Sequence, residues 1–159
     1  MPSRFEAGFH FALIDERAAV GEKPLGYGGG FTYRLTRFVA LDSAVNRYPL
    51  DGQTSFPVTQ ALVGIRAGIK IGGVGLYGKI RPGFLRYDET LFGSAIGTKP
   101  NLDVGGVLEF YSSRHIGVRF DMGRSIVFYG NNPIAAPLGP RTPGTSNQLQ
   151  CMFGIFAHF

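Results

Sequence analysis

The chain lacks any long hydrophobic run, although 44% of its 159 residues are hydrophobic. No window approaches the roughly 18–20 uncharged apolar residues that a membrane-spanning helix requires. A helical membrane protein is therefore excluded. Cysteine is nearly absent as well. Because Cys151 is the only cysteine, the chain cannot form an intramolecular disulfide.

Clusters of basic residues are also missing, although the formal net charge is +5 and the pI is near 9.6. The lysines and arginines are dispersed singly, whereas a nucleic-acid-binding protein usually carries a basic patch or stripe. Nucleic acid is therefore not an expected partner. The sequence also shows no metal-ligand spacing, phosphate-binding loop or internal repeat, so we expect no metal and no cofactor.

Glycine, in contrast, is abundant, with 24 residues against an average usage of roughly 7%. The glycines are flanked by β-branched and aromatic residues, which argues against a flexible linker. Glycine inside a strand marks a place where the wall bends or where a side chain must be omitted. A small barrel with a crowded interior needs many such places, and the length of the chain fits one domain over residues 1–159.

The final segment, 147–159, alternates between two faces. One face carries Leu149, Cys151, Phe153, Ile155, Ala157 and Phe159. This period of two predicts a strand whose faces meet different surroundings. The apolar face continues to Phe159, whereas the ends of soluble domains are commonly loose and polar. A strand with lipid against its outer face and a last aromatic at the membrane interface explains the pattern.

Eight segments with this alternation follow one another along the chain. They cover residues 4–14, 25–35, 38–47, 58–70, 74–86, 101–111, 115–129 and 147–159. The connections alternate between long and short, as in outer-membrane barrels with short periplasmic turns and longer extracellular loops. Nearly all charged residues in the middle of the segments lie on one face, and the aliphatic and aromatic residues lie on the other. The sequence therefore predicts an all-β fold, an eight-stranded antiparallel up-and-down transmembrane β-barrel.

Three local features carry expectations of their own. Residues 71–73 predict a tight turn of the glycine type that hairpins favour. Pro82 withdraws a donor from the ladder, so we expect a bulge or the end of a strand there. Arg124 falls on the apolar face. It is expected to lie beyond the hydrocarbon band, unless a bulge shifts the phase before Ile126 and Phe128.

A lipocalin-like barrel is the soluble alternative, because its apolar face points inward around a ligand. Such a barrel would have to place Phe5, Phe9 and Phe11 inside while exposing glycines and charges. The interior of an eight-stranded barrel is only just wide enough for side chains. The membrane barrel is therefore the preferred interpretation.

The strand pattern, the charged lumen and the terminal Phe159 resemble the small outer-membrane barrels typified by the membrane domain of outer membrane protein A. Residues 79–84 and 103–111 look like segments of uncharacterised bacterial outer-membrane β-barrel proteins. The resemblance implies a bacterial outer-membrane location with periplasmic termini and extracellular long loops. No secretory leader precedes the first strand, so we expect a mature form with an added initiator Met.

The resemblance also implies an assembly signal in the last strand. In this family that strand carries alternating apolar residues and ends on an aromatic. Phe153, Ile155 and Phe159 match the signal together with Leu149, and Gly154 lies near the usual glycine. Met152 stands where a polar residue is common, and Ala157 is a weak apolar position. The barrel-assembly machinery is the partner that this signal implies.

Charged residues on the inward face form the candidate functional site. The expected lumen network comprises Glu6, Asp42, Arg66, Lys79, Arg81, Glu109, Arg119 and Asp121, with Arg34, Lys70 and Asp103 on the same face. Because burial of an unpaired charge is costly, these groups must pair or be hydrated. The preferred hypothesis is a salt-bridged polar plug in a non-enzymatic barrel with a structural role in the envelope. The alternative is a narrow or gated channel for ions or small solutes, in which rearranged Arg–Glu pairs admit water.

Some eight-stranded barrels modify lipid A, and this enzymatic alternative requires a nucleophilic Ser, a His and an acid within hydrogen-bond reach. The topology places His115 and His158 at the periplasmic end, away from the outer leaflet. His10 is an inward mid-barrel residue that fits a packed polar network better than a catalytic role. The sequence therefore predicts that the protein is not an enzyme.

Cations on the expected extracellular side are candidates for contact with the outer-membrane lipids. They are Arg17, Lys23, Arg47, Lys99 and Arg141. Charge-assisted hydrogen bonds could hold lipopolysaccharide phosphates there, although ordinary solvated charges are the simpler interpretation. The loops are also too short for a large docking surface.

Overall fold

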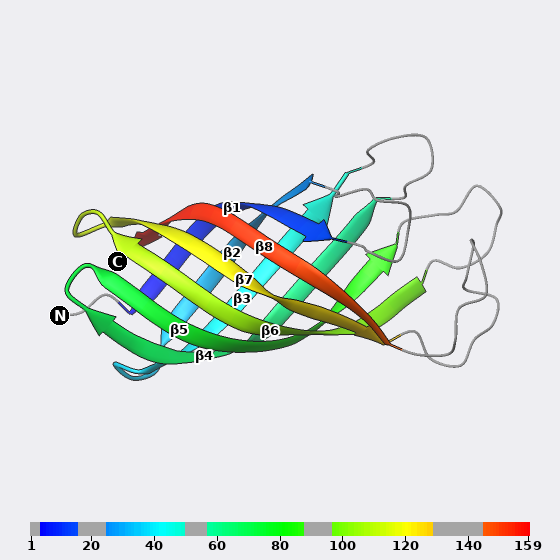
Figure 1. The fold of residues 1–159 in the computed structure, drawn as a ribbon. Coiled ribbons are helices and arrows are strands. Elements are labelled where there is room, and N and C mark those ends of the chain that lie inside the picture. Colours follow the sequence, from blue (N-terminus) through cyan, green and yellow to red (C-terminus); the bar gives the residue numbers. More distant parts are fainter. Residues whose placement is uncertain (1–3, 16–24, 50–56, 88–96, 129–144) are drawn as a thin grey trace.

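The computed structural model is an eight-stranded closed barrel and describes residues 4–15, 25–49, 57–87, 97–128 and 145–159 (Figure 1). The strands are β1 (Phe5–Asp15), β2 (Leu25–Arg34), β3 (Val39–Tyr48), β4 (Val58–Ile71), β5 (Val74–Tyr87), β6 (Gly97–Tyr111), β7 (Ile116–Phe128) and β8 (Thr145–His158). No helix among the described residues has the length and apolarity needed to cross a membrane.

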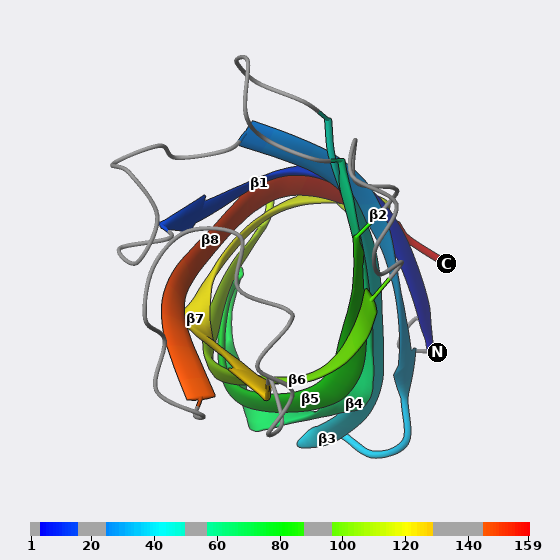
Figure 2. The ribbon, with the colours of Figure 1, turned by 90° about the vertical axis from the view of Figure 1, so that its right-hand side faces the viewer.

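Each strand pairs antiparallel with its neighbours in sequence, and β1 closes the ring by pairing with β8. The closing ladder runs from Glu6 opposite His158 to Asp15 opposite Leu149. Viewed along the barrel, the strands form an unbroken ring (Figure 2). The predicted fold class is thereby confirmed.

The two ends of the barrel differ in their connections. At one end, which we call the turn end, three short turns join β2 to β3, β4 to β5 and β6 to β7, and β1 begins beside the end of β8 (Figure 1). The predicted glycine turn lies there, and Gly72 has a φ of 59°, a left-handed conformation that glycine adopts without steric cost. The opposite end, where residues 16–24, 50–56, 88–96 and 129–144 connect the strands, is called the loop end.

The two faces of the wall separate as the alternation predicts. Phe9, Phe11 and Phe153 are about half exposed on the outer face. Glu6 and Arg66 lie buried on the inner face. Because the apolar residues point outward, the lipocalin-like alternative is excluded.

Two glycines make room for large inward side chains. Gly26 lies against the ring of Tyr48, and Gly117 lies against the ring of Phe156. A Cβ at either position would overlap the aromatic ring beside it. The prediction that glycine marks omitted side chains is correct at these two positions.

The expectation for Pro82 is wrong. Pro82 pairs with Leu102 of β6, and the β4–β5 register is the same before and after it, so no bulge is present. Strand β5 continues to Tyr87 and needs a partner along that length. Strand β6 therefore begins at Gly97, and Pro100 pairs with Phe84, whereas the sequence predicted a loop through residue 100.

Arg124 is exposed on the outer face. The registers of β7 with both neighbours are constant, so the alternative of a bulge is wrong. Tyr48, just beyond the predicted segment 38–47, is the buried last residue of β3. Strand β8 begins two residues earlier than predicted, at Thr145.

Candidate functional site

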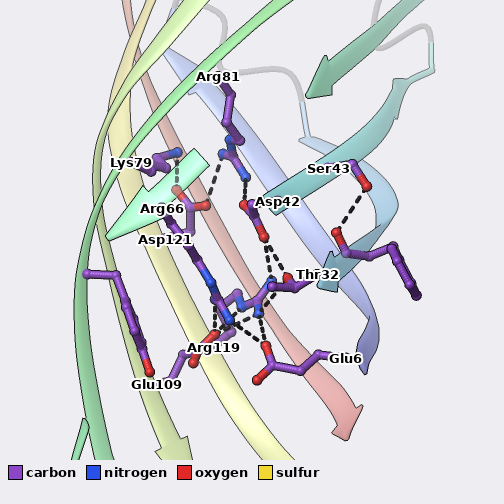
Figure 3. Close-up of polar contacts among 12 residues, drawn as sticks. Glu6, Thr32, Asp42, Ser43, Arg66, Lys79, Arg81, Glu109, Arg119 and Asp121 are labelled. Atoms are coloured by element: carbon purple, nitrogen blue, oxygen red, sulfur yellow. Dashed lines mark hydrogen bonds and ion pairs between the residues drawn. The ribbon is translucent and has the colours of Figure 1, made fainter. Parts of the chain in front are cut away.

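The barrel interior is filled by ionised side chains that come from seven of the strands, β1 to β7. The structure places all eight predicted lumen residues on the inner face, buried except for the half-buried Arg119: Glu6, Asp42, Arg66, Lys79, Arg81, Glu109, Arg119 and Asp121. Arg34 and Asp103 join them through ion pairs. These ten residues form two adjoining clusters. Figure 3 shows the members Glu6, Asp42, Arg66, Lys79, Arg81, Glu109, Arg119 and Asp121.

The turn-side ion cluster consists of Glu6, Arg34, Arg66, Glu109 and Arg119. Glu6 accepts from three arginines, with 2.5 Å to Arg66 Nη2, 2.9 Å to Arg119 Nη2 and 3.0 Å to Arg34 Nε. Glu109 accepts from Arg119 Nε at 2.7 Å and also pairs with Arg66. Two carboxylates thus hold three guanidinium groups from β2, β4 and β7.

The central ion cluster lies next to it toward the loop end and consists of Asp42, Lys79, Arg81, Asp103 and Asp121. Arg81 joins three aspartates: Nη1 lies 2.9 Å from Asp42 Oδ2, and Nη2 lies 2.5 Å from Asp103 Oδ2 and 3.0 Å from Asp121 Oδ2. Lys79 Nζ lies 2.6 Å from Asp103 Oδ2 and also pairs with Asp121. Arg119 Nη1, 3.6 Å from Asp42 Oδ1, connects the two clusters.

The charges of the two clusters balance. Five cations (Arg34, Arg66, Lys79, Arg81 and Arg119) face five carboxylates (Glu6, Asp42, Asp103, Glu109 and Asp121). Isolated buried charges would be very costly, and good geometry with matched partners offsets that cost. Lys70 was predicted to share the inward face. It lies exposed at the turn end, with Nζ 3.3 Å from the ring centroid of Tyr111, and belongs to neither cluster.

Two neutral side chains that the sequence analysis did not single out complete these clusters. Tyr111 donates its hydroxyl hydrogen to Glu109 Oε2 at 2.6 Å. Thr32 donates to Asp42 Oδ1 at 2.6 Å and is fully buried. In the sequence, both residues alternate onto the inward face of their strands, and this alternation could have identified them as lumen residues. It could not identify their partners on other strands.

Replacing Thr32 by Val keeps the shape of the side chain and removes the hydrogen bond to Asp42. We expect the free energy of unfolding to fall by about 1–3 kcal/mol, because a buried carboxylate oxygen loses a donor. Urea unfolding of the refolded protein in lipid vesicles, followed by circular dichroism, measures the change. Thr98→Val, at an exposed position of β6, is the matched control and should leave stability unchanged. Equal stability of Thr32→Val and the unmodified chain would contradict this role.

A third group, the amide cluster, lies toward the loop end and carries no formal charge. It consists of Asn46, Tyr48, Gln60 and Gln150. Gln60 Oε1 accepts from Asn46 Nδ2 at 2.8 Å and from Gln150 Nε2 at 2.6 Å. Gln150 Nε2 also lies 2.9 Å from the hydroxyl oxygen of Tyr48. Amides both donate and accept, so they close this part of the lumen without ions.

A small hollow of about 20 Å³ lies beside His10, next to the central ion cluster. His10, Arg81, Arg119 and Asp121 contribute to its lining, together with glycines of β1, β2 and β8. Its volume is enough for roughly one water molecule, and its walls offer polar partners. It is far too small for a solute path.

Two of the three histidines, His10 and His158, make hydrogen-bond contacts through their rings. His10 Nε2 lies 2.5 Å from Asn46 Oδ1, and His158 Nε2 lies 3.3 Å from the backbone oxygen of Ser113. His115 is exposed in the β6–β7 turn. Within the described part of the chain, no group of three or more His, Cys, Asp or Glu residues could hold a metal ion.

The residues predicted as an assembly signal line the outer face of β8. Phe153, Ile155 and Phe159 are all exposed. The backbone of Phe159 exchanges hydrogen bonds with Phe5 at 3.0 and 3.1 Å, and the two rings stack at 6.3 Å. Phe159 therefore extends the closing ladder of the barrel, while recognition by the assembly machinery stays a prediction.

Several known structures with the same architecture are small outer-membrane barrels. Neisserial surface protein A matches with a TM-score of 0.67 at 16% identity, over 98% of this chain and 97% of that one. The fold is that of a small outer-membrane β-barrel. Ail, the attachment invasion locus protein of Yersinia pestis, matches this barrel with a TM-score of 0.63 at 15% identity, over 99% and 97% of the two chains.

A third structure extends this similarity. The N-terminal β-barrel domain of Pseudomonas aeruginosa OprF matches the present chain with a TM-score of 0.62 at 13% identity, over 99% of both chains. Neither the protein-family models nor the curated protein sequences give a match. At these identities the likeness concerns the fold, and functions must be argued from the residues.

Proposed function

We propose that the protein is a non-enzymatic integral protein of the bacterial outer membrane, with a structural role in the envelope and a closed lumen. The observation that carries the proposal is the charge-balanced interior. Five cations and five carboxylates, each paired, occupy the barrel between the turn end and the amide cluster. An eight-stranded barrel leaves room for little else.

The outer face supports the membrane location. Large apolar side chains on every strand are exposed there, among them Phe9, Val63, Leu76 and Ile155. Such a continuous apolar band would be an aggregation hazard in water, whereas lipid covers it at no cost. The similar solved structures are outer-membrane barrels, which favours the bacterial outer membrane over other membranes.

The proposed orientation places the turn end in the periplasm and the loop end outside the cell, because outer-membrane barrels have short periplasmic turns. The barrel-assembly machinery would then recognise β8 through Phe153, Ile155 and Phe159. Outer-membrane lipids would surround the barrel, and cations at the loop end would contact lipopolysaccharide phosphates; of these cations Arg17, Lys23 and Arg141 lie outside the described residues. The non-enzymatic part of the proposal is supported by His10, whose Nε2 lies 2.5 Å from the amide oxygen of Asn46.

Expression with a secretory leader in a Gram-negative host tests the location. The protein should sediment with the outer-membrane fraction and migrate faster on a gel before heating than after, because the folded barrel stays compact in detergent. A soluble periplasmic protein without such heat-modifiable mobility would overturn the proposal. Protease added to whole cells should cut only within the four long loops, and cleavage at the turns would reverse the orientation.

The second candidate function is a narrow or gated channel for ions or small solutes. The water-sized hollow beside His10 favours it, because Arg81, Arg119 and Asp121, which belong to the two ion clusters, line this hollow. Arg119 contacts carboxylates of both ion clusters. For conduction, Arg119 would have to exchange these ion-pair partners so that a water-filled path connects the hollow with the turn end. This candidate predicts ion conduction, whereas the closed plug predicts none.

A further inference from the structure

His10 lies on the inner face in the middle of β1, outside both ion clusters. Its ring contacts the amide cluster, and no carboxylate in the described part of the chain forms an ion pair with it. Among side chains, the imidazole has the ordinary pKa closest to neutral pH. His10 can therefore change the charge of the lumen under conditions in which arginines and aspartates keep theirs.

The amide cluster determines which ring nitrogen of His10 carries a hydrogen. Asn46 Nδ2 donates to Gln60 Oε1 at 2.8 Å, which leaves Asn46 Oδ1 as the acceptor that faces His10 Nε2 at 2.5 Å. His10 Nε2 therefore carries a hydrogen in the neutral and in the charged ring, and the additional proton is taken up at Nδ1. Because the hydrogen bond to Asn46 is the same in both states, protonation changes the charge at this position and not the contact.

Both strands beside β1 carry glycine at the level of His10. Its partner on β2 is Gly28, and its partner on β8 is Gly154. A Cβ at Gly154 would lie 2.5 Å from the Cβ of His10, so a side chain at that position would displace the imidazole. Glycine within a strand often marks such a close approach. The neighbouring strands thus make room for the ring but supply no carboxylate that could compensate a charge on it.

The charged groups that face His10 come from β5 and β7. Arg81, Arg119 and Asp121 line the hollow of about 20 Å³ together with His10, whereas the lining residues of β2, β3 and β8 are uncharged. Asp121 already pairs with Lys79 and Arg81. A protonated His10 would therefore be a sixth cation in a lumen that five cations and five carboxylates balance. A charge without its own partner is costly to bury.

We propose that His10 is an acid-sensitive switch of the lumen and that its protonation loosens the plug. At neutral pH the ring is uncharged and the plug is closed. The sixth positive charge repels Arg119, which is 17% exposed and connects the two ion clusters through its 3.6 Å contact with Asp42. Loss of this contact admits water between the clusters. The proposal rests on the proposed closed lumen and adds the condition under which it loosens.

Urea unfolding of the refolded protein in lipid vesicles, at about pH 7.5 and at about pH 5.0, tests the switch. The unfolded chain exposes the imidazole to water, where it is protonated at the lower pH, whereas the closed lumen disfavours the proton. The unfolding equilibrium constant should therefore increase by up to about thirtyfold, the limit for one imidazole with an ordinary pKa of about 6.5. Stability is full above that pKa and decreases as the pH falls below it.

Two histidine variants separate the switch from general effects of acid. His10→Gln keeps an amide donor for Asn46 and cannot titrate, so most of the pH dependence should disappear. His115→Gln, in the exposed β6–β7 turn, is the matched control and should keep it. Amide hydrogen exchange of the folded protein, corrected for the intrinsic rate at each pH, should become faster around Arg119 at the lower pH in the unmodified chain and not in His10→Gln.

Three outcomes would overturn the proposal. The first is equal pH dependence of His10→Gln and the unmodified chain. The second is greater stability at the lower pH, which would mean that Asp121 compensates the charged ring inside a closed plug. The third needs no variant that must fold: protonation of His10 in the folded barrel, seen in its ring chemical shifts, with unchanged exchange around Arg119. Ion conduction at neutral pH would instead contradict the closed lumen, so the two failures are distinguishable.

Discussion

Replacing Arg81 by Met should lower the free energy of unfolding by about 3–5 kcal/mol, the range expected when one partner of a buried ion pair is removed. Arg81 is 2% exposed and joins Asp42, Asp103 and Asp121. After the substitution Lys79 remains paired with Asp103 and Asp121, and Asp42 keeps only the more distant Arg119, at 3.6 Å. The mutual repulsion of the three carboxylates has no solvent to screen it, which makes this a large expected effect. Urea unfolding in lipid vesicles measures it.

A double-mutant cycle separates lost pairing from lost volume. Asp121→Asn in the Arg81→Met background removes one of the uncompensated carboxylates, so the double variant should be more stable than Arg81→Met alone. Arg114→Met, at an exposed turn position, removes the same charge and should leave stability unchanged. A stability of Arg81→Met within 0.5 kcal/mol of the unmodified chain, roughly the effect of a neutral surface change, would refute the buried network.

Replacing Ile65 by Arg should lower the free energy of unfolding in a bilayer by about 2–4 kcal/mol, the cost of an arginine near the bilayer midplane on the lipid face of a barrel. Ile65 lies near the middle of β4 and is 47% exposed on the outer face. Ile71 lies on the same face of the same strand, at the turn end, and is 73% exposed. Arginine there should cost only about 0–1 kcal/mol, because the position lies near the interface.

The pair of isoleucines distinguishes a membrane barrel from a water-soluble one. In water, an arginine at either exposed position would be tolerated, and the two variants would have equal stability. In a membrane, the central position must be the costly one. Equal unfolding free energies of Ile65→Arg and Ile71→Arg in vesicles would therefore contradict the assignment of the outer face to lipid.

The fold was predictable because a period of two is a local property of the sequence. Each strand assigns its residues to one of two faces, and the eight predicted segments match the observed strands to within two residues except at the start of β6. That start was missed because Gly97 and Pro100 are residues typical of loops. The pairing of β5 with β6 includes Pro82 and continues to Tyr87, so residues 97–100 pair with the end of β5.

The site was predictable only in part, since parity fixes the face of a residue but not its partners. Inward parity brought Arg66 and Glu109 into the set of candidates. Their direct pairing joins β4 and β6 across the lumen, which depends on strand tilt and stagger. Lys70 alternates onto the same face as Arg66, but it is four residues nearer the turn. Its side chain is therefore exposed at the turn end of the barrel. The amide cluster was missed because uncharged side chains do not stand out in a search for buried charges.

Single-channel recording of the refolded protein in a planar bilayer tests the closed lumen most directly. Folding and insertion are first verified by heat-modifiable mobility of the same sample. With ten ionised side chains paired across the lumen, the expected result is a bilayer without discrete conductance steps. Discrete openings that change in size or frequency in Arg66→Gln or Glu109→Gln would contradict the plug and establish the protein as a channel.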